Sequence, residues 1–189
     1  MNELTVRCTE VSLACKDSPI TAYLRQFAAE KTGILITPDT DPLKIRQMIT
    51  GVQDLMIQAA KNGEFVDENE NYVINHHFAG GVYAREMHIP AGHVVVGKIH
   101  KQENLHFLSK GSATVITEEG GVEEVQAGVM MKSPKGVKRL LITHADTIWT
   151  VLHATDETDV DKIEADVIAK KYSDIGWQDP TPLIEKKEA

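Results

Sequence analysis

The sequence predicts a mainly β chain, a small sandwich or closed barrel of short antiparallel strands, with a helical part before it and a helix after it. Three observations support this prediction. From about residue 72 onward, short runs rich in valine, isoleucine and threonine recur at about 8–12-residue spacing. Turns that contain glycine or proline separate these runs. On either side of this region, apolar residues instead recur at three- and four-residue steps, which is the period of an amphipathic helix.

The chain therefore divides into three parts. We expect a helical N-terminal extension over residues 1–71, a β-barrel over 72–156, and a C-terminal helix and tail over 157–189. A chain of 189 residues is long enough to bury one full hydrophobic core together with a small extension.

Charge and cysteine content narrow the class of partner. The chain has 20 Lys and Arg against 28 Asp and Glu, a net charge of −8, so we expect no nucleic-acid partner. No apolar run approaches the roughly 20 residues that span a bilayer, and the N-terminus lacks the layout of a signal peptide, so we expect no membrane partner. Cys8 and Cys15 form no metal-type pair, and we interpret both as small buried residues of a cytoplasmic protein.

The N-terminal extension is expected to contain one strand and two helices. Residues 4–14 alternate in polarity, which favours an edge strand. The first helix begins at Pro19, with Ser18 as its N-cap, and runs to about Lys31. The second begins at Pro42, after Thr40 or Asp41 as the cap, and is closed by Asn62-Gly63.

A continuous apolar stripe runs along the second of these helices. Its members recur at three- and four-residue steps: Ile45, Met48, Ile49, Val52, Leu55, Met56, Ala59 and Ala60. Burial against the body of the domain is one interpretation, because most helices are held by such packing. A helix-pairing surface for self-association is the other.

The predicted strands of the barrel follow one another without helices between them. They cover residues 82–89, 93–100, 105–108, 112–118, 122–126, 129–132, 137–143 and 147–153. Glu119-Gly120-Gly121 suits a hairpin turn, and Ser133-Pro134-Lys135-Gly136 suits a type I turn. Residues 159–172 return to a helical period, with Val160, Ile163, Val167 and Ile168 on one side.

The best candidate site lies in the stretch from Gly97 to Gly111, which is predicted to form a strand, a polar turn and a second strand. Side chains alternate along a strand, so two sets are each expected to share a face: Val94, Val96, Lys98 and His100 on the first strand, and Asn104, His106 and Leu108 on the second. His100 and His106 are therefore predicted to converge at the mouth of one antiparallel pair.

The spacing of glycines and prolines around this stretch resembles the cupin family. The first cupin motif reads Gly, five residues, His-x-His, three or four residues, Glu, six residues, Gly. Anchored on Gly92 and Gly111, it places Lys98 and His100 at the two histidines and Asn104 at the glutamate. The second motif begins Pro-x-Gly-x-x-His, and anchoring it on Pro134 and Gly136 places Arg139 at its histidine. This resemblance implies a jelly-roll barrel, the double-stranded β-helix, in which only His100 of the four metal ligands is present.

Several longer runs are similar to uncharacterised cupin-like proteins of bacteriophages and prophages. They are residues 83–90, 97–100, 108–111, 138–139 and 146–149. The resemblance implies a phage-related protein, either a virion component or an accessory protein in the host cytoplasm. Its expected partners are a second copy of the chain, as a homo-oligomer, and other phage proteins.

Three functional hypotheses follow. The leading one is a divergent, non-enzymatic assembly or binding module without a cofactor, because Lys98 and Arg139 are normally cationic and would repel a divalent metal. The second is a metal-dependent enzyme of the isomerase or dioxygenase type, with a divalent metal at His100 and His106. Glu103 is a conceivable third donor, although in an extended backbone it points to the opposite face from Asn104. His144 and His153 would add donors only if the fold brings them near. The third is a small-anion site formed by Lys98, His100 and Arg139, with Asn104 and His106 as polar walls.

A barrel filled by its own side chains would explain the same residues without any ligand. The remaining histidines are interpreted as surface or core residues, and Trp149 as part of the core.

Overall fold

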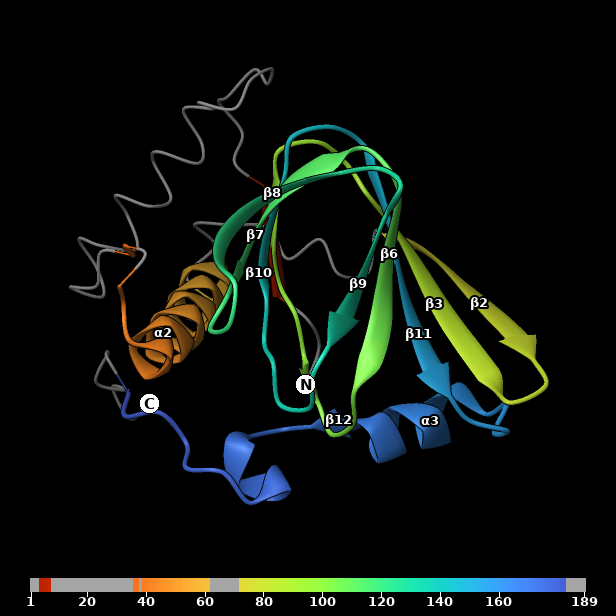
Figure 1. The fold of residues 1–189 in the computed structure, drawn as a ribbon. Helices are drawn as coiled ribbons and strands as arrows, with labels where there is room; N and C mark the ends of the chain where they lie inside the picture. Colours follow the sequence, from red (N-terminus) through yellow and green to blue (C-terminus); the bar gives the residue numbers. More distant parts are fainter. Residues whose placement is uncertain (1–3, 8–35, 38, 62–71, 183–189) are drawn as a thin grey trace.

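The chain folds into two five-stranded antiparallel sheets that face each other (Figure 1). The computed structural model describes residues 4–7, 36–37, 39–61 and 72–182. Sheet A has the order β1 (Leu4–Arg7), β4 (His93–Val96), β10 (Leu140–Thr143), β7 (Ser112–Thr117) and β8 (Gly121–Gln126). Sheet B has the order β2 (Val73–Ala79), β3 (Val82–Ile89), β11 (Thr147–Ala154), β6 (Asn104–Lys110) and β9 (Val129–Ser133). A two-stranded sheet pairs β5 (Ile99–His100) with β12 (Ile168–Ala169).

The strand order within these sheets is that of a jelly roll. Without β1, β2 and the short β5, eight strands remain in two four-stranded sheets, β4-β10-β7-β8 and β3-β11-β6-β9. The pairing is nested, because β3 pairs with β11 and β4 pairs with β10. Eight strands in two Greek keys define this architecture. The mainly β, cupin-like jelly-roll fold is therefore confirmed, with one helix before the barrel and another after it.

The interior of the barrel is apolar where the two sheets face each other. It contains Met87, Ile89, Val95, Leu108, Ala113, Val115, Leu141 and Trp149, all of them buried. The interpretation of Trp149 as a core residue is confirmed, since its side chain is 5% exposed.

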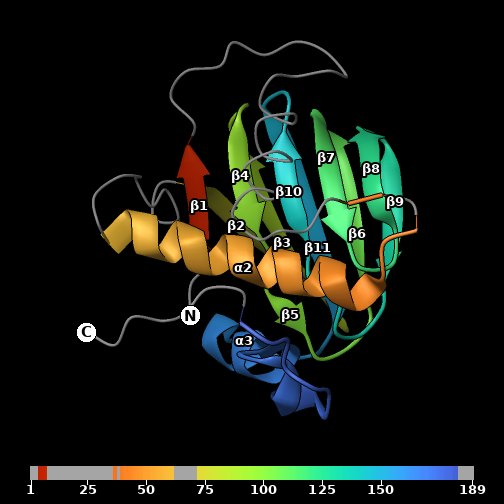
Figure 2. The same cartoon turned by 90° about the vertical axis from the view of Figure 1, so that its left-hand side faces the viewer.

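Helix α2 (Pro42–Lys61) lies across the outer face of sheet A (Figure 2). Asp41 is its N-cap, because Asp41 Oδ1 accepts a hydrogen bond from the backbone N–H of Leu43 at 2.9 Å. The stripe residues Ile45, Met48, Ile49, Val52 and Met56 are buried together with Val94, Val96, Ile116, Leu140 and Ile142. The stripe is thus a packing surface within the chain. The alternative, that it pairs with a second helix in a homo-oligomer, is wrong for these five residues.

The strand predicted over 93–100 is interrupted. β4 ends at Val96, and Gly97 instead donates its backbone N–H to Arg139 O at 2.8 Å. After this break the chain resumes as β5, which pairs with a different strand. Val94 and Val96 face α2, whereas His100 contacts His106, so the prediction that they share one face is wrong.

Two other predicted elements are shorter in the structure, and the strands β2 and β12 were not predicted. Residues 137–139 precede β10 without strand structure. Helix α3 covers Val160–Val167 only, because Ile168 and Ala169 leave the helix to pair with β5, and a 3₁₀ turn, η1 (Tyr172–Ile175), follows. Strand β2 forms a hairpin with β3 at the edge of sheet B.

Some predictions concern residues that the structure does not describe. The predicted helix over 19–31, and Cys8 and Cys15, lie outside the described residues. None of the described helices is long and apolar enough to cross a membrane.

Candidate functional site

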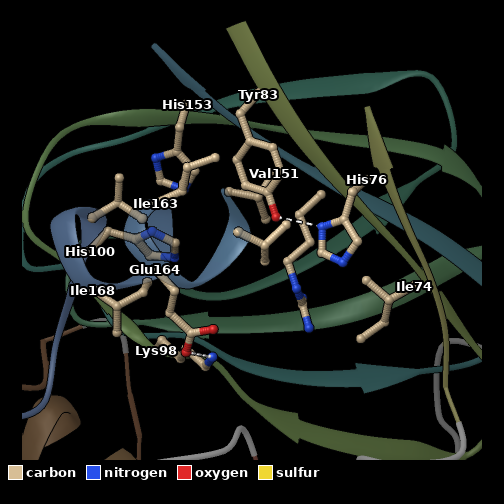
Figure 3. A pocket seen from close by; sticks show the side chains of 13 residues that line it. Ile74, His76, Tyr83, Lys98, His100, Val151, His153, Ile163, Glu164 and Ile168 are labelled. Atoms are coloured by element: carbon tan, nitrogen blue, oxygen red, sulfur yellow. Dashed lines mark hydrogen bonds and ion pairs between the residues drawn. The ribbon is translucent and has the colours of Figure 1, made fainter. Parts of the chain in front are cut away.

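The site lies at the mouth of the barrel, where α3 packs beneath sheet B (Figure 1). Two adjoining cavities occupy this mouth. The outer chamber, about 270 Å³, lies between α3 and strands β2, β3 and β11, and Figure 3 shows its lining side chains. The inner chamber, about 40 Å³, lies inside the barrel. The two chambers share four of their lining residues: Arg85, Lys98, His100 and Val151.

Three histidines gather between the chambers. The ring centroids of His100 and His106 are 5.9 Å apart, so these two residues converge as predicted, although His100 lies on the separate strand β5. His153 joins them from β11, and its ring stacks on that of His100 at 5.0 Å (Figure 3).

All three imidazoles are held neutral. Burial, the adjacent His153 ring, and the nearby charges of Arg139, Lys98 and Arg85 lower the pKa of His100 to about 3. Burial and the Arg139 guanidinium hold the pKa of His106 well below its usual value, and burial lowers the pKa of His153 to about 4.

His106 is fixed by contacts with two hydrogen-bond donors. Trp149 donates its Nε1–H to His106 Nδ1 at 2.8 Å, in a fully buried contact. An indole N–H only donates, so Nδ1 must carry the lone pair of the neutral ring and Nε2 must carry the proton. Arg139 Nη1 lies 3.1 Å from this Nε2, and a guanidinium also only donates. Two donors therefore face each other beside the inner chamber, with no acceptor between them.

Arg139 is poorly satisfied for a largely buried cation. Its Nη1 donates to Ser133 Oγ at 2.8 Å, but its Nε is buried without a hydrogen-bond partner. No carboxylate of the described residues forms an ion pair with it. Burial lowers the pKa of Arg139 to about 10, although the charges of Glu119 and Glu123 raise it. The guanidinium is therefore still charged at neutral pH.

Lys98 is engaged elsewhere. Its side chain lines both chambers, but its ammonium forms an ion pair with Glu164 on α3 (Figure 3). The structure thus places Lys98 near His100, as predicted, but ties its charge to the helix rather than leaving it beside Arg139.

Three further sequence candidates do not join the site. Asn104 is buried next to the turn, where its amide donates to Gln102 O at 3.3 Å, and it lines neither chamber. Glu103 is exposed and pairs with Lys132 at 2.8 Å. His144 contacts Thr114 at 2.7 Å and Glu124 at 3.1 Å on sheet A.

Arg85 is the site residue that the sequence reasoning missed. It lies on β3 between Tyr83 and Met87, which are both buried, so alternation alone places its side chain on the inward face. A charged residue on the otherwise apolar inward face of a strand was the available signal. His76 and Tyr83, which share a hydrogen bond of 2.8 Å at the rim, carry no comparable signal (Figure 3).

These residues do not fit a divalent metal. No group of three or more His, Cys, Asp or Glu side chains that could hold a metal occurs among the residues that the structure describes. A metal-bound histidine coordinates through one ring nitrogen and donates a hydrogen bond from the other. His106 does the reverse, because its one lone pair accepts the Trp149 N–H and its protonated nitrogen faces a cation.

Comparisons with known proteins add only distant structural similarity. No family model and no curated protein matches the sequence. Among solved structures, KdgF from Halomonas sp. is 13% identical, with a TM-score of 0.42 over 51% of this chain and 88% of that one.

Two further solved structures show the same level of similarity. An RmlC-like cupin family protein from Methanocaldococcus jannaschii is 19% identical, with a TM-score of 0.39 over 45% of this chain and 81% of that one. An acetylacetone dioxygenase from Acinetobacter johnsonii is 16% identical, with a TM-score of 0.37 over 46% and 69%. Scores this low say nothing about activity, substrate or metal.

Proposed function

We propose that the chain is a binding module whose barrel holds a small organic anion, with the anionic group in the inner chamber beside Arg139 and His106. One observation carries this proposal. Arg139 Nη1 and the protonated Nε2 of His106 lie 3.1 Å apart, and neither can accept a hydrogen bond from the other. An anionic oxygen in the adjoining chamber would accept from both groups and would also pair with the buried guanidinium charge.

The charges around the inner chamber support the same conclusion. Its lining includes Arg85, Lys98 and Arg139 but no carboxylate. In the outer chamber, Glu164 is the one carboxylate among the described lining residues, and it is paired with Lys98. This basic pocket lies in a chain with a net charge of −8, so attraction of an anion is a local property of the site.

The metal-dependent alternative is not proposed, because the donors at His106 do not fit a metal. Elemental mass spectrometry of the purified, untagged protein tests this point. We expect metal well below one equivalent. A near-stoichiometric metal that is lost on His106→Gln would overturn our assignment. Association with phage particles and formation of a homo-oligomer remain predictions; light scattering coupled to size exclusion tests the second.

Titration calorimetry with acetate, benzoate, glucuronate and inorganic phosphate at constant ionic strength tests anion binding. We expect at least one carboxylate to bind the wild-type protein and the same carboxylate to lose about tenfold or more in affinity in Arg139→Met. Lys135→Met is the matched control, because it removes one positive charge from an exposed turn outside both chambers. Failure of every probe to bind, or equal loss in both variants, would contradict the proposal.

A further inference from the structure

The outer chamber differs in chemistry from the inner one. Six aliphatic side chains line it: Ile74, Val151, Val160, Ile163, Val167 and Ile168. Its polar groups are largely engaged with each other, since His76 shares a hydrogen bond with Tyr83 at 2.8 Å and Lys98 is paired with Glu164. Arg85, His100 and His153 also line the chamber, so a ligand body there contacts an aliphatic surface that is interrupted by polar side chains.

The sizes of the two chambers set the size of the ligand. The inner chamber, at about 40 Å³, exceeds the roughly 10–15 Å³ that one water molecule needs, and it has room for a single small polar group. The outer chamber, at about 270 Å³, is larger than the apolar cavity of about 150 Å³ that holds benzene in another protein. One anionic group joined to a body of one ring would occupy both chambers.

We infer that the ligand is a monocarboxylate with a compact apolar body of about one ring, and not a sugar acid, a phosphate or a short acid such as acetate. The inference rests on the proposed function and specifies its ligand class. The carboxylate lies in the inner chamber beside Arg139, and the body lies under α3 against Val151 and Ile163.

Polar bodies are selected against by the aliphatic wall. Each hydroxyl of a sugar acid that loses water without gaining a partner lowers affinity by about tenfold. An apolar ring that removes roughly 100 Å² of its surface from water gains about 70-fold over a ligand without a body. The walls therefore rank ligands by their bodies, while Arg139 selects for the anionic group.

Calorimetry with four sodium salts at one pH and ionic strength tests the ranking. We expect benzoate and cyclohexanecarboxylate to bind about 70-fold more tightly than acetate, and glucuronate to bind no more tightly than acetate. Equal affinities for acetate and benzoate, both lost in Arg139→Met, would overturn the inference and leave the proposed function standing. Tighter binding of glucuronate would overturn it as well. If no carboxylate binds, the proposed function fails and the inference fails with it.

Substitutions at two neighbouring residues test where the apolar body of the ligand lies. Val151 lines both chambers, whereas Leu152, the next residue on β11, lines neither. Val151→Thr exchanges a methyl for a hydroxyl of similar shape, so it should weaken benzoate by about tenfold and weaken it more than acetate, which meets this side chain only in the inner chamber. Leu152→Thr should leave both unchanged. Equal benzoate affinity in the two variants, with thermal melts that show both to be folded, would place the body elsewhere and refute the inference.

Discussion

Acid should destabilise this protein between pH 7 and pH 5, well before its carboxylates titrate. The cause is the cluster of neutral histidines at the barrel mouth. Burial lowers the pKa of His100 to about 3 and that of His153 to about 4, and the pKa of His106 is also well below its usual value. An unfolded chain places all three at about 6.5. The unfolded state therefore binds protons first as the pH falls, and stability is lost below about pH 6.5.

The size of the effect follows from these values. One unit between the folded and unfolded pKa corresponds to about 1.4 kcal/mol. At pH 5 an unfolded imidazole is almost fully protonated while His100 and His153 in the folded chain are still neutral, so each of these two costs about 2 kcal/mol relative to neutral pH. Together they cost about 4 kcal/mol, and His106 adds to the loss in the same direction; the total stability of an ordinary domain is about 5–15 kcal/mol. The loss continues until the pH reaches the folded values, near 3 to 4.

Urea denaturation at pH 7.5, 6.5, 5.5 and 5.0 measures this loss as a slope of the unfolding free energy against pH. Two protons taken up by His100 and His153 on unfolding give about 3 kcal/mol per pH unit below pH 6, and His106 and His76, whose pKa values are also lowered by burial, steepen the slope. Carboxylates contribute at lower pH, because hydrogen bonds from Asn75 and Ser173 lower the pKa values of Glu86 and Asp179 from already acidic values. The window from pH 5 to 7 therefore isolates the histidines.

His153→Phe should reduce this slope by about 1.4 kcal/mol per pH unit, because it removes one titrating group and keeps a stacked ring on His100. His77→Phe, at an exposed position on β2, should leave the slope unchanged. An uptake of less than one proton between pH 6 and pH 5, or a slope that His153→Phe does not alter, would refute the assignment of three neutral imidazoles.

Three further predictions concern the framework around the site. Gly111→Ala should lower stability by more than about 2 kcal/mol in urea denaturation, because Gly111 has φ +85° and an added Cβ would lie 2.5 Å from Asp146 O; normal stability would refute this geometry. Met48→Ala should cost about 2–5 kcal/mol through a cavity under α2, without any change in mass by light scattering, and a change in oligomeric state would instead favour a pairing helix. Lys98→Gln should increase amide hydrogen exchange in α3 and β12, because it removes the ion pair with Glu164; unchanged exchange would show that strand pairing alone holds the segment.

Local patterns in the sequence were sufficient for several parts of this structure. The cap at Asp41 and the period of the following residues predicted α2 and its buried face. Strand alternation predicted that Asn104, His106 and Leu108 share one face of their strand, and all three are buried. These features depend on neighbours within a few residues, so a single sequence contains them.

The parts that could not be predicted depend on contacts between distant residues. His153 reaches the cluster because β11 lies between β3 and β6, and no local period specifies that order. Ile168 leaves α3 because its backbone pairs with His100, far earlier in the chain. The same pairing ends the helix and places α3 over the barrel mouth. One long-range contact therefore accounts for the shorter helix α3 and for the unpredicted strand β12.

Trp149 explains how a barrel of this type can favour anions. If Arg139 alone were replaced by a smaller residue, His106 would still present a protonated nitrogen to the chamber, because the Trp149 N–H would still occupy its lone pair. Arg139 and Trp149 thus contact opposite nitrogens of the His106 ring. Both contacts suit the proposed anion better than a metal. Trp149 occupies the His106 lone pair that a metal would need, and Arg139 supplies the charge that the proposed anionic oxygen would meet. A site described only by its missing metal ligands would overlook this, because Trp149 occupies none of the motif positions and belongs to the core.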